Sequence, residues 1–110
     1  MQRNKRYERE YASLMCSKGN HCERIAGSGS AKEAVCDCIL IKEGTTFLVE
    51  VKTTKLPVFY LRKHIKEQLE KMQATALKQE IHALLAIKFK NRGWQQLDIT
   101  EKIPEVIKCN

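Results

Sequence analysis

Several signals that define large classes of proteins are missing from this sequence of 110 residues. No run approaches the roughly 18 apolar residues that a membrane-spanning helix needs. Residues 1–6 are basic, but no apolar segment follows them, so a secretory signal peptide is not expected. There is also no internal repeat, no low-complexity segment and no domain linker. These absences predict one domain over residues 1–110, in the cytoplasm and without a membrane partner.

Motifs for common kinds of catalysis are missing as well. The sequence has no Ser/His/Asp set and no phosphate-loop glycine pattern, so acyl transfer and nucleotide hydrolysis are poorly supported. The spacing of metal-binding histidines is absent from His21, His64 and His82, and no C-x-x-C pair exists. Nothing in the sequence predicts a small-molecule substrate.

Acidic residues are outnumbered by basic ones. The chain has 20 Lys+Arg against 13 Asp+Glu, which gives a formal net charge of +7 and a pI near 9.3. This balance favours a polyanionic partner, because lysine and arginine neutralise phosphates. Charge alone is equally consistent with a basic protein that has no nucleic-acid role.

Cysteine, in contrast, is abundant, with five residues in a short chain. Without a secretory signal, reduced thiols are expected, and a buried cysteine then packs as a small hydrophobic side chain. Cys36 and Cys38 flank Asp37 and are expected to share one strand face. The alternative is a zinc site in which four thiols are the ligands: Cys16, Cys22, Cys36 and Cys38.

The spacing of apolar residues predicts two helices. The first is indicated by residues at positions i, i+4, i+7 and i+8, before the helix-ending pair Gly19-Asn20: Tyr7, Tyr11, Leu14 and Met15. The second is indicated by residues spaced four, three and four apart: Ile65, Leu69, Met72 and Ala76.

Five short segments have the composition of strands: residues 21–25, 35–41, 47–52, 83–87 and 94–99. The second and third are expected to form a hairpin whose turn includes Glu43 and Gly44. The tail is expected to hold one short helical turn at most, near Pro104. The order α-β-β-β-α-β-β predicts an α/β fold with a central mixed five-stranded sheet flanked by helices.

The most informative feature is a pair of acids in two neighbouring apolar strands, Asp37 in the first and Glu50 in the second. Side chains alternate along a strand, so Glu50 and Lys52 share one face, and the core-forming face holds Phe47, Val49 and Val51. Two carboxylates in apolar surroundings repel each other, and a divalent cation is the usual compensation. Lys52 would supply a point charge for a phosphate or an attacking water. This combination is typical of metal-dependent cleavage of nucleic acid.

The order Asp37, then Glu50-Val51-Lys52, matches the D…E-x-K signature of the restriction-endonuclease-like nucleases. Further matching segments are Glu8-Arg9-Glu10, residues 24–28, residues 85–89 and Gly93-Trp94. In this order they resemble the archaeal Holliday junction resolvases, the Hjc family. The resemblance implies an intracellular, nucleoid-associated homodimer that binds four-way DNA junctions and cuts two strands symmetrically. It also implies Mg²⁺ or Mn²⁺ as cofactor, with two ions per active site.

The resemblance also implies roles for individual residues. Asp37 and Glu50 resemble the metal-binding carboxylates, and the carbonyl of Val51 is similar to the backbone ligand that joins them. Lys52 resembles the catalytic lysine, which positions or activates water and stabilises charge at the phosphate. Glu8 matches the catalytic and metal-binding acid of the first helix, because Tyr7-Glu8-Arg9-Glu10 aligns with the family's A-E-R-E. Glu10 is the competing choice.

The remaining implied contacts are to DNA. Arg24 matches the basic residue before the glycine- and serine-rich loop, and Ser28 matches the loop serine that contacts DNA near the cleavage point. Ser30 is the alternative serine. A basic approach surface is expected from eight further residues: Arg3, Lys5, Arg6, Arg9, Lys55, Arg62, Lys63 and Lys66.

Two other functions stay open. One is a nuclease of the same fold that acts on another branched or damaged DNA, since fold does not decide function. The other is a non-catalytic basic nucleic-acid-binding module whose cysteines hold zinc. Substrate competition separates the first from a junction resolvase, and stoichiometric zinc without magnesium-dependent cleavage would favour the second.

Overall fold

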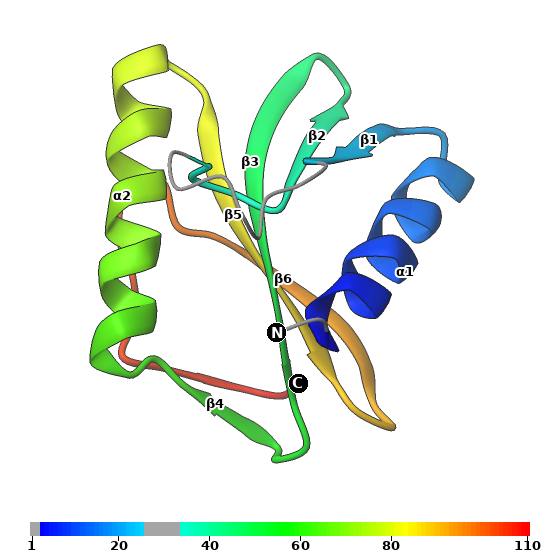
Figure 1. The fold of residues 1–110 in the computed structure, drawn as a ribbon, viewed down its shortest axis with the longest axis vertical. Helices are drawn as coiled ribbons and strands as arrows, with labels where there is room; N and C mark the ends of the chain where they lie inside the picture. Colours follow the sequence, from blue (N-terminus) through cyan, green and yellow to red (C-terminus); the bar gives the residue numbers. More distant parts are fainter. Residues whose placement is uncertain (1–2, 26–33) are drawn as a thin grey trace.

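The fold is a mixed five-stranded sheet with one helix on each face (Figure 1). The computed structural model describes residues 3–25 and 34–110. The two helices are α1 (Arg3–Ser17) and α2 (Lys63–Gln79). The strands in chain order are β1 (His21–Arg24), β2 (Cys38–Lys42), β3 (Thr45–Thr54), β4 (Val58–Tyr60), β5 (His82–Phe89), β6 (Gly93–Asp98) and β7 (Val106–Lys108). Neither helix is long and apolar enough, over its described residues, to cross a membrane.

The strands of the large sheet follow the order β1-β2-β3-β5-β6. All neighbours are antiparallel except β3 and β5, which are parallel. Parallel neighbours need a long crossover connection, and α2 lies within the connection between β3 and β5. The predicted α/β fold, with its mixed five-stranded sheet and two flanking helices, is therefore confirmed.

The predicted hairpin joins β2 to β3 through a two-residue turn. Lys42 pairs with Thr45, so Glu43 and Gly44 alone form the turn. Both have positive φ angles, +51° and +81°, as a type I′ turn requires. Glycine adopts this conformation without the steric cost that a side chain brings, which explains Gly44 at the second position.

Each face of the sheet carries its own hydrophobic core. Under α2, the fully buried Leu69 and Met72 pack with Leu85 of β5. Under α1, the buried Tyr11 packs in a cluster with Val51 of β3, as predicted for that strand face. Burial of one such side chain contributes roughly 1.5–3 kcal/mol, so the two cores together hold both helices against the sheet.

Two short strands outside the large sheet were not predicted. β4 and β7 pair as a separate two-stranded sheet, at the bottom of Figure 1. The tail, for which one short helical turn at most was expected, holds no helix near Pro104 and continues into β7, where Ile107 pairs with the buried Phe59. Tyr60 points outward, with 54% of its surface exposed.

The expectation that Cys36 and Cys38 share one strand face is wrong. β2 begins only at Cys38, and Asp37 forms a bend before it. The backbone of Asp37 donates a hydrogen bond to the Val49 carbonyl and accepts one from Ile25 N–H. The bend interrupts the alternation of side chains, so Cys36 packs in the core under α2 and Cys38 in the core under α1.

Candidate active site

The bend before β2 places the carboxylate of Asp37 against the middle of β3. Asp37 Oδ2 accepts a hydrogen bond of 2.9 Å from the backbone N–H of Val51. Glu50, the residue before, has only 3% of its surface exposed, and its pKa responds to the charge of Asp37. The structure therefore brings together Asp37, Glu50 and the backbone of Val51, the residue whose carbonyl the family resemblance implies as a ligand.

Glu50 is an unusual carboxyl group because of this burial. Loss of solvent raises its pKa to about 8, and the neighbouring charge of Asp37 acts in the same direction. Lys52 opposes the shift, since its Nζ lies 3.3 Å from Glu50 Oε2. As predicted, Glu50 and Lys52 share one strand face, and the lysine is the nearest compensating charge among the described side chains.

Glu8 approaches Asp37 from the helix. It lies on the buried side of α1, with 5% of its surface exposed. Burial raises the pKa of Glu8, and the charge of Asp37 adds to the rise. Arg24 Nε lies 3.5 Å from Glu8 Oε1 as an ion pair. Within residues 3–25 and 34–110, both atoms are buried without a hydrogen-bond partner.

Glu10, the competing acid, is engaged elsewhere. Its Oε2 accepts hydrogen bonds from Lys88 Nζ at 2.7 Å and from Trp94 Nε1 at 2.9 Å. The bond from Lys88 lowers the pKa of Glu10, which is the opposite of the shift at Glu8. The geometry thus favours Glu8 as the helix acid beside Asp37.

The contacts of Glu10 with Lys88 and Trp94 were not predicted from the sequence. A signal was present, because Lys88 follows Leu84 and Ala86 at two-residue spacing and shares their strand face. Leu84 and Ala86 belong to the core under α1, so a lysine on that face needs a partner from the helix.

The donor groups have the chemistry of an oxygen-ligated divalent-cation site, although their side chains are not arranged as a complete set of ligands. Two carboxylates meet at Val51, the pKa of Glu50 is raised by burial and by Asp37, and Glu8 Oε1 is buried without a hydrogen bond in the described residues. A cation would relieve all three conditions. In the same residues, no group of three or more His, Cys, Asp and Glu side chains is arranged to hold a metal ion. Mg²⁺ suits such a site, since it needs few carboxylates and keeps several waters.

The four thiols of the zinc alternative do not gather at one place. Cys22 and Cys38 are buried in the core under α1, and Cys36 is buried in the core under α2. Cys16 is exposed near the end of α1, where its thiol contacts the Cys22 carbonyl. The sheet separates Cys36 from the others, so the three buried cysteines, Cys22, Cys36 and Cys38, are better explained as packing residues.

The residues expected to contact DNA fall into three groups. Those on the surface are Arg6, Arg9, Lys55, Arg62 and Lys63, with Lys5 half-buried. Two are engaged with acids, Arg24 with Glu8 and Lys66 with Glu105. Ser28 and Ser30 lie outside the described residues, and so does the side chain of Arg3.

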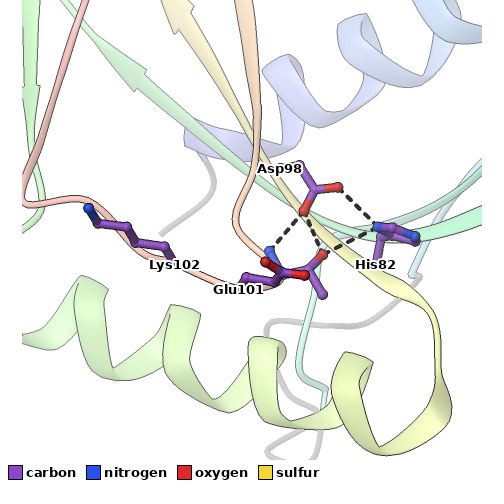
Figure 2. Close-up of a pocket in the computed structure, with 5 residues that line it drawn as sticks. His82, Asp98, Glu101 and Lys102 are labelled. Atoms are coloured by element: carbon purple, nitrogen blue, oxygen red, sulfur yellow. Dashed lines mark hydrogen bonds and ion pairs between the residues drawn. The ribbon is translucent and has the colours of Figure 1, made fainter.

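A second polar cluster lines a cavity of about 300 Å³ at the other end of β5 (Figure 2). His82 Nδ1 lies 3.0 Å from Asp98 Oδ2, and Asp98 also accepts a hydrogen bond from Thr100 N–H. His82 pairs with Phe47 near the start of β3, whereas Lys52 pairs with Ile87. None of the predicted site residues lines this cavity.

Comparison with known proteins identifies the family and the fold. The sequence profile of the archaeal Holliday junction resolvase family (Hjc) matches residues 1–108. The structure is similar to that of Archaeoglobus fulgidus Hjc, a Holliday junction resolvase from an archaeal hyperthermophile. The TM-score is 0.71 with 28% sequence identity, over 94% of this chain and 85% of that chain.

A second solved structure, SSO0001, gives a TM-score of 0.42 with 22% identity, over 64% of this chain and 33% of that one. No curated protein matches the sequence. The family profile covers nearly the whole chain, and the fold agrees with it. The chain therefore belongs to the archaeal Holliday junction resolvase family.

Proposed function

We propose that residues 1–110 form a single nuclease domain, which resolves four-way DNA junctions by divalent-metal-dependent hydrolysis of phosphodiester bonds. One observation carries the proposal. Asp37 and Glu50 meet at the Val51 backbone, in a partly desolvated position where two carboxylates destabilise each other. Structural acids are seldom buried together without a full set of partners, and perturbed acids of this kind mark functional sites.

The carboxylates of Asp37 and Glu50 and the carbonyl of Val51 would hold Mg²⁺ or Mn²⁺, with two ions per site. When bound, the metal neutralises charge on the phosphate and makes water a stronger nucleophile. Glu8 supplies a third carboxylate from α1, which is next to Asp37. Ser28 remains part of the proposed site as a residue that contacts DNA near the cleavage point.

Lys52 is proposed to act directly on the substrate. The Lys52 side chain is 17% exposed, and its Nζ lies 3.3 Å from Glu50 Oε2, so the lysine presents a fixed positive charge beside the acids. From this position it can orient the attacking water and stabilise the negative charge that develops on the phosphate. Lysine suits this role because its ammonium group is a compact point charge.

DNA is proposed to approach over the basic surface around the acids. Exposed Arg6 and Arg9 lie on α1, while Lys55, Arg62 and Lys63 lie between the end of β3 and the start of α2. Such residues neutralise phosphates and carry little sequence information, so recognition would depend on the shape of the junction. Symmetric cleavage needs two identical sites at a fixed separation, which a homodimer provides.

The test is cleavage of a labelled immobile four-way junction, compared with linear duplex of the same sequence, in Mg²⁺ and in EDTA. Paired, symmetric, Mg²⁺-dependent nicks at the junction are expected, and light scattering should report a dimer. Preferred cleavage of a flap or nicked-duplex competitor would assign another branched substrate. If neither DNA is bound or cut, the proposed function is wrong.

A further inference from the structure

Glu10 forms a compact hydrogen-bonded cluster on the opposite side of α1 from the active-site acids. Glu10 Oε2 accepts from both Lys88 Nζ, at 2.7 Å, and Trp94 Nε1, at 2.9 Å. Lys88 Nζ also lies 5.6 Å from the centroid of the Trp94 ring. The side chain of Lys88 is 23% exposed and that of Glu10 is 39% exposed, so the lysine is the better shielded partner of this ion pair.

The cluster continues into the core through Tyr11. The rings of Tyr11 and Trp94 are 5.3 Å apart, and the Tyr11 hydroxyl donates a hydrogen bond of 2.6 Å to Gln96 Oε1. Tyr11 is fully buried. These contacts, together with the bonds of Glu10, attach the middle of α1 to β5 and β6.

Glu8 and Glu10 point to different sides of the helix. Two residues correspond to a rotation of about 200° about the axis of an α-helix. Glu8 faces Arg24 of β1 and the bend at Asp37, whereas Glu10 faces the strands at the other edge of the sheet. The helix therefore crosses the sheet with one acid bound on each side.

The contacts of Glu8 itself hold it only weakly beside Asp37. Glu8 and Asp37 carry like charges, and the nearest cation, Arg24, is 3.5 Å away without a hydrogen bond to Glu8 Oε1 in the described residues. When both carboxyl groups are ionised, repulsion from Asp37 would favour a position of α1 farther from the bend. The contacts of Glu10 resist this movement, because rotation of the helix would break the bonds to Lys88 and Trp94.

We propose that Glu10, Lys88 and Trp94 are positioning residues that hold Glu8 beside Asp37 in the metal centre. The proposal rests on the proposed function, in which Glu8 serves the metal site. It assigns the second acid of Glu8-Arg9-Glu10 a role distinct from that of the first. Glu10 acts through the placement of α1, without contacting metal or DNA.

A double-mutant cycle tests the proposal. Glu10→Ala is made alone and together with Glu8→Gln, and Mn²⁺ affinity is measured by calorimetry without DNA, along with single-turnover junction cleavage. Displacement of a site group can cost a factor of ten to a hundred, so Glu10→Ala alone should weaken both properties by roughly tenfold. In the Glu8→Gln background it should change neither, because the group that it positions is already gone.

Conservative variants separate positioning from loss of packing. Glu10→Gln keeps an acceptor oxygen for Lys88 and Trp94, so it should stay within about threefold of the parent protein. Trp94→Phe removes the Nε1 donor but keeps a ring against Tyr11, and it should weaken Mn²⁺ binding without unfolding the protein. Trp94→Phe therefore keeps the test decisive if Glu10→Ala folds poorly.

Asp98→Asn is the matched control. Asp98 and His82 form another ion pair between β5 and β6, with side chains 46% and 47% exposed, at the opposite end of β5 (Figure 2). Loss of the Asp98–His82 ion pair should lower the stability of the protein slightly and leave Mn²⁺ affinity and cleavage unchanged. Equal losses from Glu10→Ala in both backgrounds, or losses matched by Asp98→Asn, would show a purely structural cluster and overturn the inference.

The outcomes also separate this inference from the proposed function. Absence of cleavage by the parent protein, or full Mn²⁺ binding and cleavage by Glu8→Gln, would refute the role of Glu8 itself. Cleavage that requires Glu8 but is unaffected by Glu10→Ala and Trp94→Phe would refute only the positioning role.

Discussion

The backbone N–H of Val51 donates a hydrogen bond of 2.9 Å to Asp37 Oδ2. This bond fixes one oxygen of Asp37 against β3, next to Glu50 and on the strand that also carries Lys52. A side chain at a bend is thereby held by a central strand, which is a rigid element. The arrangement gives an acid outside the regular sheet the fixed geometry that the proposed metal site requires.

Asp37→Asn should abolish cleavage while preserving the fold and junction binding. The asparagine oxygen still accepts from Val51 N–H, but the negative charge that would hold a metal is gone. A metal contributes several kcal/mol to such reactions, so a loss of about a thousandfold is expected. Single-turnover cleavage and fluorescence anisotropy with a labelled junction measure the two properties. Unimpaired cleavage would exclude Asp37 from the site.

Glu50 should make the metal-free protein less stable as pH rises. Burial and the charge of Asp37 raise its pKa to about 8, above its ordinary value of 4.5, so between these values only the unfolded chain releases the proton. Stability is full below about pH 4.5 and declines until about pH 8, by on the order of a few kcal/mol. Glu50→Gln should remove this decline and unfold at higher temperature than the parent at pH 8.5.

Thermal unfolding in EDTA at pH 5 and pH 8.5 checks this expectation. Asp98→Asn serves as the control, because hydrogen bonds from Thr100 and His82 outweigh burial and lower the pKa of Asp98. The contribution of Asp98 to stability is lost as pH falls, whereas that of Glu50 is lost as pH rises. Identical pH profiles for the parent and Glu50→Gln would mean that Glu50 ionises normally.

Arg24→Met should destabilise the protein, because it removes the cation beside the buried Glu8. Breaking a buried ion pair costs 3–5 kcal/mol, and about 2 kcal/mol is expected here because the Arg24 side chain is 25% exposed. Adding Glu8→Gln should restore part of the stability, since no charge is then left unpaired. Urea unfolding of the single and double variants provides the measurement. An additive loss would show that the pair is not coupled.

Lys63 and Lys66 should differ in their effect on DNA binding although they are three residues apart. Lys63 is exposed, whereas Lys66 forms an ion pair with Glu105. Lys63→Gln should reduce the slope of log K against log[salt] for junction binding by about one, which corresponds to one phosphate contact. Lys66→Gln should reduce this slope less. Affinities at several salt concentrations give the two slopes. Equal slopes for both variants would contradict the distinction.

Local chemistry in the sequence was enough to predict the main elements. Apolar spacing identified α1 and α2, and alternation in β3 placed Val49 and Val51 in the core and Glu50 with Lys52 on the other face. The two-residue turn at Glu43-Gly44 also follows from local conformation. Such features depend on residues close together in the chain, so a single sequence contains the information.

Pairing between segments that are far apart in the chain could not be predicted from local sequence patterns. β4 and β7 are each three residues long and form only because residues 58–60 meet residues 106–108. The bend at Asp37, which sends Cys36 and Cys38 to opposite cores, depends on bonds to Ile25 and Val49. Neither segment carries a local signal that is strong enough to reveal these contacts.

The sequence by itself determined which residue types are available for the chemistry: an acid pair, a lysine two residues later and two acids in the first helix. Only the tertiary structure shows that Glu8 lies near Asp37 and that Glu10 binds Lys88 and Trp94 instead. Both are glutamates on one helical turn, with the same intrinsic acidity. Burial beside Asp37 raises the pKa of one, and hydrogen bonds from Lys88 and Trp94 lower that of the other. Their environments differ because the helix lies between two edges of the sheet, and that placement exists only in the folded chain.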